Sequence, residues 1–361
     1  MRAFSRLGLG LLFVSIALAD RFDDLVLRAA AARQAGDSAA ALALYREAVG
    51  IRPSWSEGWW YLGMISYDSD QYSDCRAAFS QFIKLESKSA PAWSFVGLCD
   101  FEVGAYHDAL ADFERADATG GAVPPEVEPV VRYHRALLLN ASARFEEATR
   151  ALKPLAAGSP SPALLTALGV NALRLPLLPQ ALPETQRSAV TAAGAIAAAW
   201  ISGDSAAAEA GFRDLLRTYD TAPGAHYFYA TYLLQSHPPA EVIPELRREL
   251  AVNPRNPDAH ALLALMLQQT GAIEEALPHA RQAAEARPGA PLTEYAYGVL
   301  LTDSGDVRDA IRHLEIAGRL EPNKVENHAA LAKAYSKAGR YEDARRERAA
   351  AISLARGPDA H

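Results

Sequence analysis

The chain has 361 residues, of which 50% are hydrophobic, and a formal net charge of −7 at pH 7. The hydrophobic share is large enough for extensive buried interfaces. An acidic surface repels a phosphate backbone, so the composition argues against a nucleic-acid-binding protein.

The N-terminal residues differ from everything that follows them. Arg2 and Arg6 precede an apolar run over 7–18, and a small-residue Ala-Leu-Ala sequence ends at Ala19. This pattern predicts a secretory signal peptide over 1–19, cleaved after Ala19. The apolar run is shorter than the roughly 20 residues that span a bilayer. We therefore expect an exported protein, periplasmic or secreted, with no membrane span and a mature charge of 34 − 43 = −9.

One motif then recurs at a fixed period. A glycine followed five residues later by alanine occurs at 271–276, 305–310 and 339–344, so the copies are 305 − 271 = 34 and 339 − 305 = 34 residues apart. Three copies in strict register indicate tandem structural repeats.

The motif resembles the tetratricopeptide repeat, a 34-residue helix-turn-helix unit with Trp, Leu, Gly, Tyr, Ala, Phe, Ala and Pro at set positions. The copy that starts at Ser56 carries Trp59, Leu62, Gly63 and Phe79. The copy that starts at Ala90 carries Trp93, Gly97, Ala109, Phe113 and Ala116. About ten copies fit the chain, starting near residues 22, 56, 90, 129, 162, 189, 223, 257, 291 and 325. The resemblance implies an all-α fold, a right-handed α-solenoid, or superhelix, of these units.

Two places interrupt the period. The third and fourth copies are 129 − 90 = 39 residues apart, and the extra residues fall in a turn-rich stretch, 118–125, which predicts a loop. Pro176, Pro179 and Pro183 stand where the fifth copy needs its second helix. We therefore expect an N-terminal repeat block over 20–175, an irregular Pro-rich hinge over 176–188, a C-terminal repeat block over 189–355 and a disordered tail over 356–361.

The sequence has no phosphate-binding glycine loop, no Gly-x-Ser-x-Gly, no His-Glu-x-x-His and no Cys-x-x-Cys motif. We therefore predict no enzymatic activity, no cofactor and no metal. His226, His260 and His328 are separated by 34 and 2×34 residues. Equivalent positions of successive repeats lie about a helix diameter apart, so this spacing indicates periodicity rather than one metal site. His260 and His279 lie on the two helices of one copy and could approach each other, for which we favour ordinary packing or solvation over a metal.

The two cysteines allow two interpretations. Cys75 lies on the second helix of one copy and Cys99 on the first helix of the next. They could form a disulfide in an oxidising compartment, or they could be two small buried apolar residues.

In the family, the first helix of each repeat lines a concave groove. The corresponding positions here are Trp60, Tyr61, Met64, Tyr67, Phe95, Phe101, Tyr133, Trp200, Tyr227, Phe228 and Tyr295. About half of them should belong to the core instead, because an aromatic stripe on a helix is more often packing than binding. Lys333 and Lys337 occur only in the last copy, so the groove differs from the basic clamp that family members use for acidic chaperone tails.

The resemblance implies a non-catalytic protein–protein interaction scaffold or adaptor of the cell envelope. An aromatic groove suits an extended peptide or a helix of a partner protein. A glycan- or polymer-binding repeat protein is the alternative, because Trp and Tyr stack on sugar rings, and an accessory subunit of an enzyme is a further one. Self-association stays open, because solenoid ends and convex faces are common contact surfaces.

Overall fold

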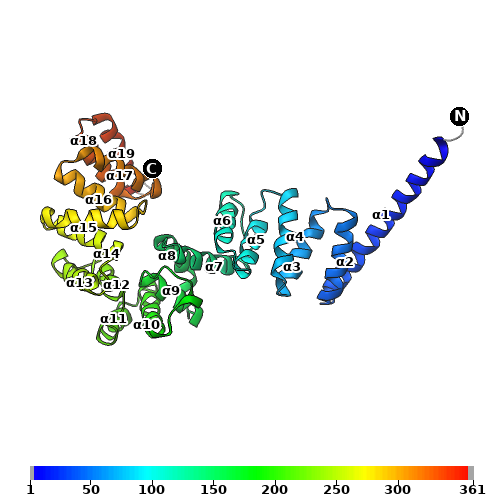
Figure 1. The fold of residues 1–361 in the computed structure, drawn as a ribbon, viewed down its shortest axis with the longest axis horizontal. Helices are drawn as coiled ribbons and strands as arrows, with labels where there is room; N and C mark the ends of the chain where they lie inside the picture. Colours follow the sequence, from blue (N-terminus) through cyan, green and yellow to red (C-terminus); the bar gives the residue numbers. More distant parts are fainter. Residues whose placement is uncertain (1–3, 357–361) are drawn as a thin grey trace. The chain divides into compact units, whose positions relative to one another are not determined.

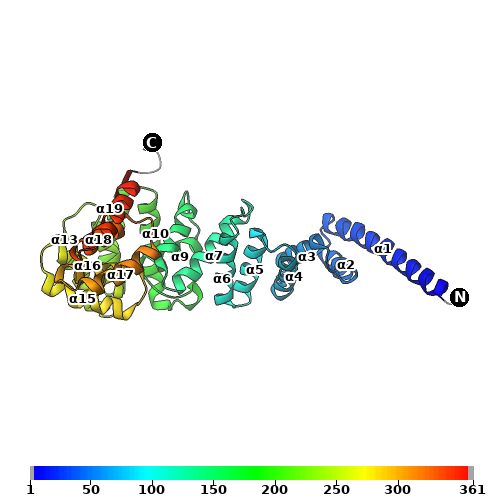
Figure 2. The same cartoon turned by 90° about the horizontal axis from the view of Figure 1, so that it is seen from above.

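The computed structural model describes residues 4–356, and within this part of the chain it contains helices and no strand (Figures 1 and 2). The first half of the α-helices comprises α1 (Phe4–Gln34), α2 (Ser38–Ile51), α3 (Ser56–Asp68), α4 (Tyr72–Leu85), α5 (Ala90–Glu102), α6 (Tyr106–Ala118), α7 (Glu128–Ala141), α8 (Phe145–Leu152) and α9 (Pro162–Ala172). The second half comprises α10 (Glu184–Ile201), α11 (Ser205–Thr218), α12 (Ala225–Leu233), α13 (Pro239–Val252), α14 (Pro257–Gln269), α15 (Ile273–Ala286), α16 (Pro291–Ser304), α17 (Val307–Leu320), α18 (Val325–Lys337) and α19 (Tyr341–Arg356). Two short 3₁₀ helices are η1 (Lys153–Ala156) and η2 (Pro179–Ala181).

Most helices form antiparallel pairs that stack on their neighbours. The helices of each pair, such as α3 with α4 and α5 with α6, pack against each other, and the second helix then packs against the first helix of the next pair (Figure 1). The predicted all-α helical-repeat solenoid is therefore confirmed. The predicted loop over 118–125 is also confirmed, because α6 ends at Ala118 and α7 begins at Glu128.

Most pairs turn at a residue with left-handed backbone, whereas the connection between α12 and α13 has none. Gly271, Gly305 and Gly339 have φ of 84°, 97° and 74°, which glycine adopts without steric cost. Asp70 and Ala143 take the same place after α3 and α7, with φ of 57° and 56°. The recurring glycine of the sequence motif is thus the residue that closes the turn.

The recurring small residues of the motif set the distance between paired helices. A Cβ atom on Gly63 would lie 2.6 Å from the ring of Phe79, and one on Gly97 would lie 2.7 Å from the ring of Phe113. Both phenylalanines are almost fully buried. The missing side chain on the first helix therefore makes room for the ring on the second, and each buried ring contributes roughly 1.5–3 kcal/mol.

The chain divides into two compact units. The first takes the chain up to Pro160 together with Pro176–Ala181, and the second takes Ser161–Leu175 and the chain from Leu182 onward. A core of the first unit includes Leu42, Tyr45, Leu62 and Ile65. A core of the second includes Leu246, Leu263, Met266 and Leu300.

The fifth copy of the motif keeps its first helix, α9, but has no second helix of its own. The Pro-rich segment follows instead, and α10 begins at Glu184, inside the stretch expected to be irregular, and packs directly on α9. A Cβ atom on Gly169 would lie 1.9 Å from the Val190 carbonyl oxygen, and one on Gly194 would lie 1.9 Å from that of Leu165. The two helices therefore touch through their backbones.

A disulfide joins Cys75 of α4 to Cys99 of α5, with 6.2 Å between the Cα atoms. Of the two interpretations of the cysteines, the disulfide is therefore the one found in the structure. The bond ties two successive helix pairs together across a sequence separation of 24 residues, and cross-links of this loop size stabilise folds by roughly 3 kcal/mol.

The ends of the chain bear on two further predictions. Helix α1 continues through the predicted cleavage point, and Phe22 and Leu25 beyond it are buried. Residues 1–3 of the predicted signal peptide and 357–361 of the predicted tail lie outside the described residues, while Arg356 ends α19. No helix in the described part of the chain combines the length and apolar character that a membrane crossing requires.

Candidate functional site

Six of the predicted groove side chains are half-buried on three consecutive first helices of the first unit. We call this set the aromatic surface: Trp60, Tyr61, Met64 and Tyr67 of α3, Phe101 of α5 and Tyr133 of α7. Partial burial means that each side chain is anchored by the fold and still reaches solvent.

Phe95 lies beneath the α3 part of this surface. Its side chain is 3% exposed and its ring stacks on Phe79 at 5.0 Å between centroids. Trp60 and Tyr67 each meet the Phe95 ring edge-on at 5.8 Å. The prediction that Phe95 lines the groove is therefore wrong, because its side chain points into the interface between helix pairs and supports its exposed neighbours.

A second ring cluster holds the rest of the surface. Phe101 meets His134 at 4.7 Å and Tyr106 at 5.4 Å between ring centroids, and Tyr133 meets His134 at 5.5 Å. Burial raises the pKa of Tyr133, so its hydroxyl stays neutral in ordinary conditions. These contacts restrict the rotamers of Phe101 and Tyr133.

In the second unit, two of the predicted groove residues belong to the core. Tyr227 and Phe228 on α12 are 2% and 4% exposed. Phe228 packs against Phe212 of α11 and Trp200 of α10. Their assignment to the groove is wrong, because neighbouring helices cover this side of α12. The motif alone does not show how those helices pack across α12.

The remaining two, Trp200 and Tyr295, are half-buried. The Trp200 indole nitrogen donates a hydrogen bond to Gln235 Oε1 at 3.2 Å, which joins α10 to the segment after α12. Burial raises the pKa of Tyr295. The exposed fraction of both side chains is therefore similar to that of the aromatic surface. Intervening repeats separate Trp200 from Tyr295, so the two do not form one surface.

Polar side chains connect the first helices of the last three pairs. Gln268 of α14 donates to Asp303 of α16 at 2.7 Å, and Lys333 of α18 donates to the same carboxylate. Lys337 donates to the Thr302 carbonyl oxygen at 2.7 Å. Burial alone would raise the pKa of Asp303, but the hydrogen bonds from Lys333 and Gln268 outweigh it and the pKa is lowered. Sequence reasoning singled out the lysines but missed the residues that they contact.

A second polar set, which we call the polar ladder, joins the two helices inside each of the last four pairs. Its members are always 19 residues apart: His226–Glu245, His260–His279, Glu294–His313 and His328–Glu347, with 2.8, 2.8, 2.5 and 2.6 Å between the closest atoms. The sequence signal was present in the 34-residue spacing of three histidines. The approach of His260 to His279 was considered from the sequence, but the other three pairs were missed because Glu294 replaces histidine in one copy and the partner changes from copy to copy.

The pKa values of the ladder histidines are shifted in different directions. Burial would lower the pKa of His226, but its hydrogen bond and attraction to Glu245 outweigh burial and raise it. In the neighbouring pair, burial lowers the pKa of both His260 and His279. Among the described residues, no group of three or more His, Cys, Asp or Glu side chains could hold a metal ion.

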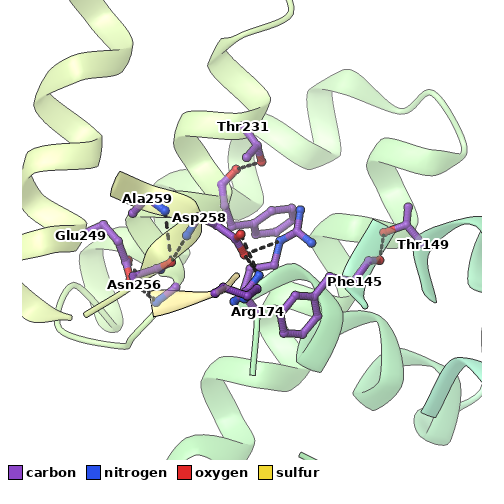
Figure 3. A network of polar contacts seen from close by, with 11 residues as sticks. Phe145, Thr149, Arg174, Thr231, Glu249, Asn256, Asp258 and Ala259 are labelled. Atoms are coloured by element: carbon purple, nitrogen blue, oxygen red, sulfur yellow. Dashed lines mark hydrogen bonds and ion pairs between the residues drawn. The ribbon is translucent and has the colours of Figure 1, made fainter. Parts of the chain in front are cut away.

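A buried polar network holds the N-terminal ends of α12 and α14 in place (Figure 3). Glu249 is fully buried and accepts hydrogen bonds from the Gly224 amide at 2.9 Å and from Asn256 Nδ2 at 2.9 Å. Asn256 in turn caps α14 by accepting from the amide of Ala259 at 3.1 Å. One carboxylate therefore holds the N-terminal ends of α12 and α14 in register.

The carboxylate of Asp258, beside this network, forms ion pairs with two arginines. Arg287 donates to its carboxylate at 2.8 Å, and Arg174, which follows α9, lies 3.9 Å away (Figure 3). The Arg174 guanidinium also lies 5.5 Å from the centre of the Tyr227 ring. The segment after α9 is thus attached to α12 and α14, which compensates for the absent second helix.

The first unit contains a buried pair of carboxyl groups, Asp100 of α5 and Asp112 of α6, which are 1% and 3% exposed. Arg76 Nε lies 2.6 Å from Asp100, and Arg115 pairs with Asp112. Burial raises the pKa of Asp100 to about 6, with Arg76 opposing the shift and Asp112 adding to it. The pair therefore tends to retain a proton at mildly acidic pH.

Comparison with known proteins supports the repeat assignment. Two family models, both described as tetratricopeptide repeat, match residues 240–291 and 301–361. The curated proteins contain no match to the sequence. These two segments of the chain are therefore tetratricopeptide repeats. Proteins of this class are typically non-catalytic scaffolds for protein–protein interaction, and their repeats imply protein partners.

Solved structures with similar folds share little sequence with the chain. MamA from Desulfovibrio magneticus RS-1, solved from residue 41 to its end, is 16% identical, and the match covers 48% of this chain and 97% of that one at a TM-score of 0.39. The APC/C hetero-tetramer Cut9–Hcn1 is 14% identical, with 94% and 67% covered at a TM-score of 0.43.

Proposed function

We propose that this protein is a non-catalytic adaptor of the cell envelope that binds an extended peptide or a helix of a partner protein on its aromatic surface. The observation that carries the proposal is the series of half-buried side chains on α3, α5 and α7, from Trp60 to Tyr133. In the family, the corresponding repeat positions line the inner side of the stack, which supports the proposal.

The chemistry of the surface favours apolar or aromatic partner side chains. Buried rings such as Phe95 hold Trp60 and Tyr67 in place before any ligand arrives. A side chain that is already ordered loses little conformational entropy on binding, so more of its contact energy appears as affinity. Aromatic residues held in this way typically dominate the binding energy of an interface.

The second unit adds a polar surface of different character. Gln268, Asp303 and Lys333 lie on three successive first helices and are linked to one another. Their amide, carboxylate and ammonium groups can exchange these mutual hydrogen bonds for contacts with the main chain or charged side chains of a partner. We infer that one partner segment presents apolar groups to the first unit or polar groups to the second.

The location in the envelope rests on the predicted signal peptide over 1–19. Fractionation of the native cells, combined with the N-terminal sequence of the purified protein, tests it. We expect a mature chain that begins at Asp20 in the exported fraction. A cytoplasmic protein that retains Met1 or its following residues would contradict the proposed location.

Binding is tested by crosslinking and pull-down from the native envelope with the wild-type chain and with Trp60→Ala and Tyr133→Ala. Both variants should lose the partner that the wild type retains, while their circular dichroism stays helical. Tyr341→Ala is the matched control, because Tyr341 is 69% exposed on α19 and lies outside the aromatic surface. The proposal fails if both variants are folded and keep every partner. Loss of binding in the presence of free sugar would favour the glycan-binding alternative.

A further inference from the structure

The last helix pair leaves a groove open on the second unit. Helices α18 and α19 form a hollow of about 510 Å³, lined mainly by Ala329, Ala332, Lys333, Lys337, Arg348 and Ile352. The floor is apolar and the rim is basic. Ile352 is 53% exposed, although it is a large aliphatic side chain.

In the preceding pairs, the equivalent surface is covered by another helix. Helix α16 packs against α14 and α15, and α18 packs against α16 and α17. No described helix covers α18 and α19 in this way. The groove therefore has the position and the apolar floor of a contact that the first helix of a following repeat would make.

The first helix pair presents a complementary surface. Helix α1 packs Phe22 and Leu25 against α2, and over residues 19–34 its opposite face is exposed. This outer face carries, at intervals of three or four residues, Asp20, Asp24, Leu27 and Ala31. Leu27 is 73% exposed, the highest value among the exposed large hydrophobic residues of the described chain. An apolar residue exposed in such a row is typical of a helix face on which no other helix packs.

The charges of the two surfaces are opposite. Lys333, Lys337 and Arg348 surround the groove, and carboxylates flank Leu27 on α1. Asp24 contacts Arg28 at 3.2 Å, but both side chains are 61% exposed, and surface pairs of this kind contribute little and exchange readily. Attraction between the basic rim and the aspartates on the outer face of α1 would orient Leu27 toward the apolar floor.

We propose that the α18–α19 groove binds the α1 helix of a second copy of this chain, with Leu27 seated beside Ile352, so that copies associate head to tail. The two surfaces of this contact are different, so the contact does not close on itself in a two-copy complex. Each added copy leaves one free groove and one free helix. The proposal does not depend on the partner-binding role of the aromatic surface.

Sedimentation velocity of the purified protein, expressed at full length with its own leader and with no partner present, tests this association. We expect the wild type to form species of increasing mass with concentration, and high ionic strength to reduce them because it screens the rim charges. Ile352→Asp and Leu27→Asp should each abolish association, since either change removes one half of every contact. Leu320→Asp is the matched control, because Leu320 is 50% exposed on α17 and lies outside both surfaces.

Mixing the two inactive variants gives the decisive result. Ile352→Asp retains an intact α1 and Leu27→Asp retains an intact groove, so the mixture should form a 1:1 complex and nothing larger. If either variant loses helicity, Ile352→Ser and Leu27→Ser replace them in the same design. A wild type that stays monomeric overturns the proposal, even if the groove binds an acidic helix of another protein, and so does a mixture that forms no complex.

Discussion

His260 Nδ1 lies 2.8 Å from His279 Nδ1, across the two helices of one repeat. His260 Nε2 lies 3.0 Å from the Pro254 carbonyl oxygen, so this nitrogen carries a proton and donates it. The His260 Nδ1 lone pair then accepts the proton of His279 Nδ1. Because only one proton fits between the two nitrogens, a second one must break the contact.

Acidification should therefore weaken the α14–α15 pair. Burial lowers the pKa of both histidines, so each one stabilises the fold above its unfolded pKa of about 6.5, and this contribution is lost as the pH falls through the folded pKa. Protection of the α14 and α15 amides from hydrogen exchange, taken relative to the intrinsic exchange rate at each pH, should fall as the pH is lowered from about 7.5 to about 5.

The neighbouring pair provides an internal control for this prediction. The pKa of His226 is raised, so its contribution is present below about pH 6.5 and is lost as the pH rises, which is the opposite sign. Protection of α12 and α13 should hold or increase on acidification. His279→Leu should reduce the acid sensitivity of α14 and α15, and an unchanged pH profile in this variant would refute the assignment.

The carboxyl pair of the first unit should make its stability fall as the pH rises. Burial raises the pKa of Asp100 to about 6, above its unfolded value of about 3.9, so its contribution is complete below about pH 4 and is lost as the pH rises through about 6. Asp100→Asn keeps the shape and stays neutral, so it should flatten this dependence. Urea unfolding at several pH values measures it, with Asp74→Asn, an exposed aspartate on α4, as the control.

Loss of the Glu249 carboxylate should destabilise the second unit. Glu249→Ala leaves the Gly224 amide and the Asn256 amide group buried without their acceptor, which should cost about 3 kcal/mol. Thermal unfolding should shift accordingly. Glu241→Ala removes an exposed carboxylate from the same helix and should change stability by less than about 0.5 kcal/mol. Equal effects of the two substitutions would contradict the capping role.

A methyl group between α9 and α10 should force these helices apart. Gly169→Ala and Gly194→Ala would each place Cβ 1.9 Å from a carbonyl oxygen of the other helix, and backbone cannot rotate away as a side chain does. Overpacking of this kind should cost at least about 1–3 kcal/mol. Gly318→Ala is the control, because its Cβ meets nothing closer than 3.4 Å and alanine favours the helix. The melting temperatures of the three variants test this prediction, and only Gly169→Ala and Gly194→Ala should lower the melting temperature.

Glycine at position 143 should stabilise the protein. Ala143 has φ of 56°, a conformation that costs a residue with a side chain roughly 1–2 kcal/mol. Ala143→Gly removes this strain but loosens the unfolded chain, so we expect a net gain of about 0.5–1 kcal/mol by denaturant unfolding. The reverse change, Gly104→Ala, occupies the equivalent turn at φ of 81° and should lose about 1 kcal/mol. Destabilisation by Ala143→Gly would show that the turn is not strained.

The local features of the fold could be predicted because they depend on residues close in the sequence. A glycine such as Gly271 closes a turn through its own φ, and a proline such as Pro179 interrupts a helix through its own ring. The extra residues over 118–125 had to form a loop for similar reasons. The candidate groove was less predictable, because a position in the motif does not tell whether a neighbouring helix covers it. Phe95 and Phe228 satisfy the motif and are nevertheless buried.

By itself, the sequence determined the repeat, its period, its turns and the places where it fails, because steric limits on backbone and small side chains act within one helix pair. Only the tertiary structure decided which aromatic rings stay accessible, that His260 meets His279, that Cys75 and Cys99 are joined, and that α10 takes the place of a missing helix beside α9. These outcomes depend on contacts between helices, whose crossing geometry arises from the packing of many side chains at once.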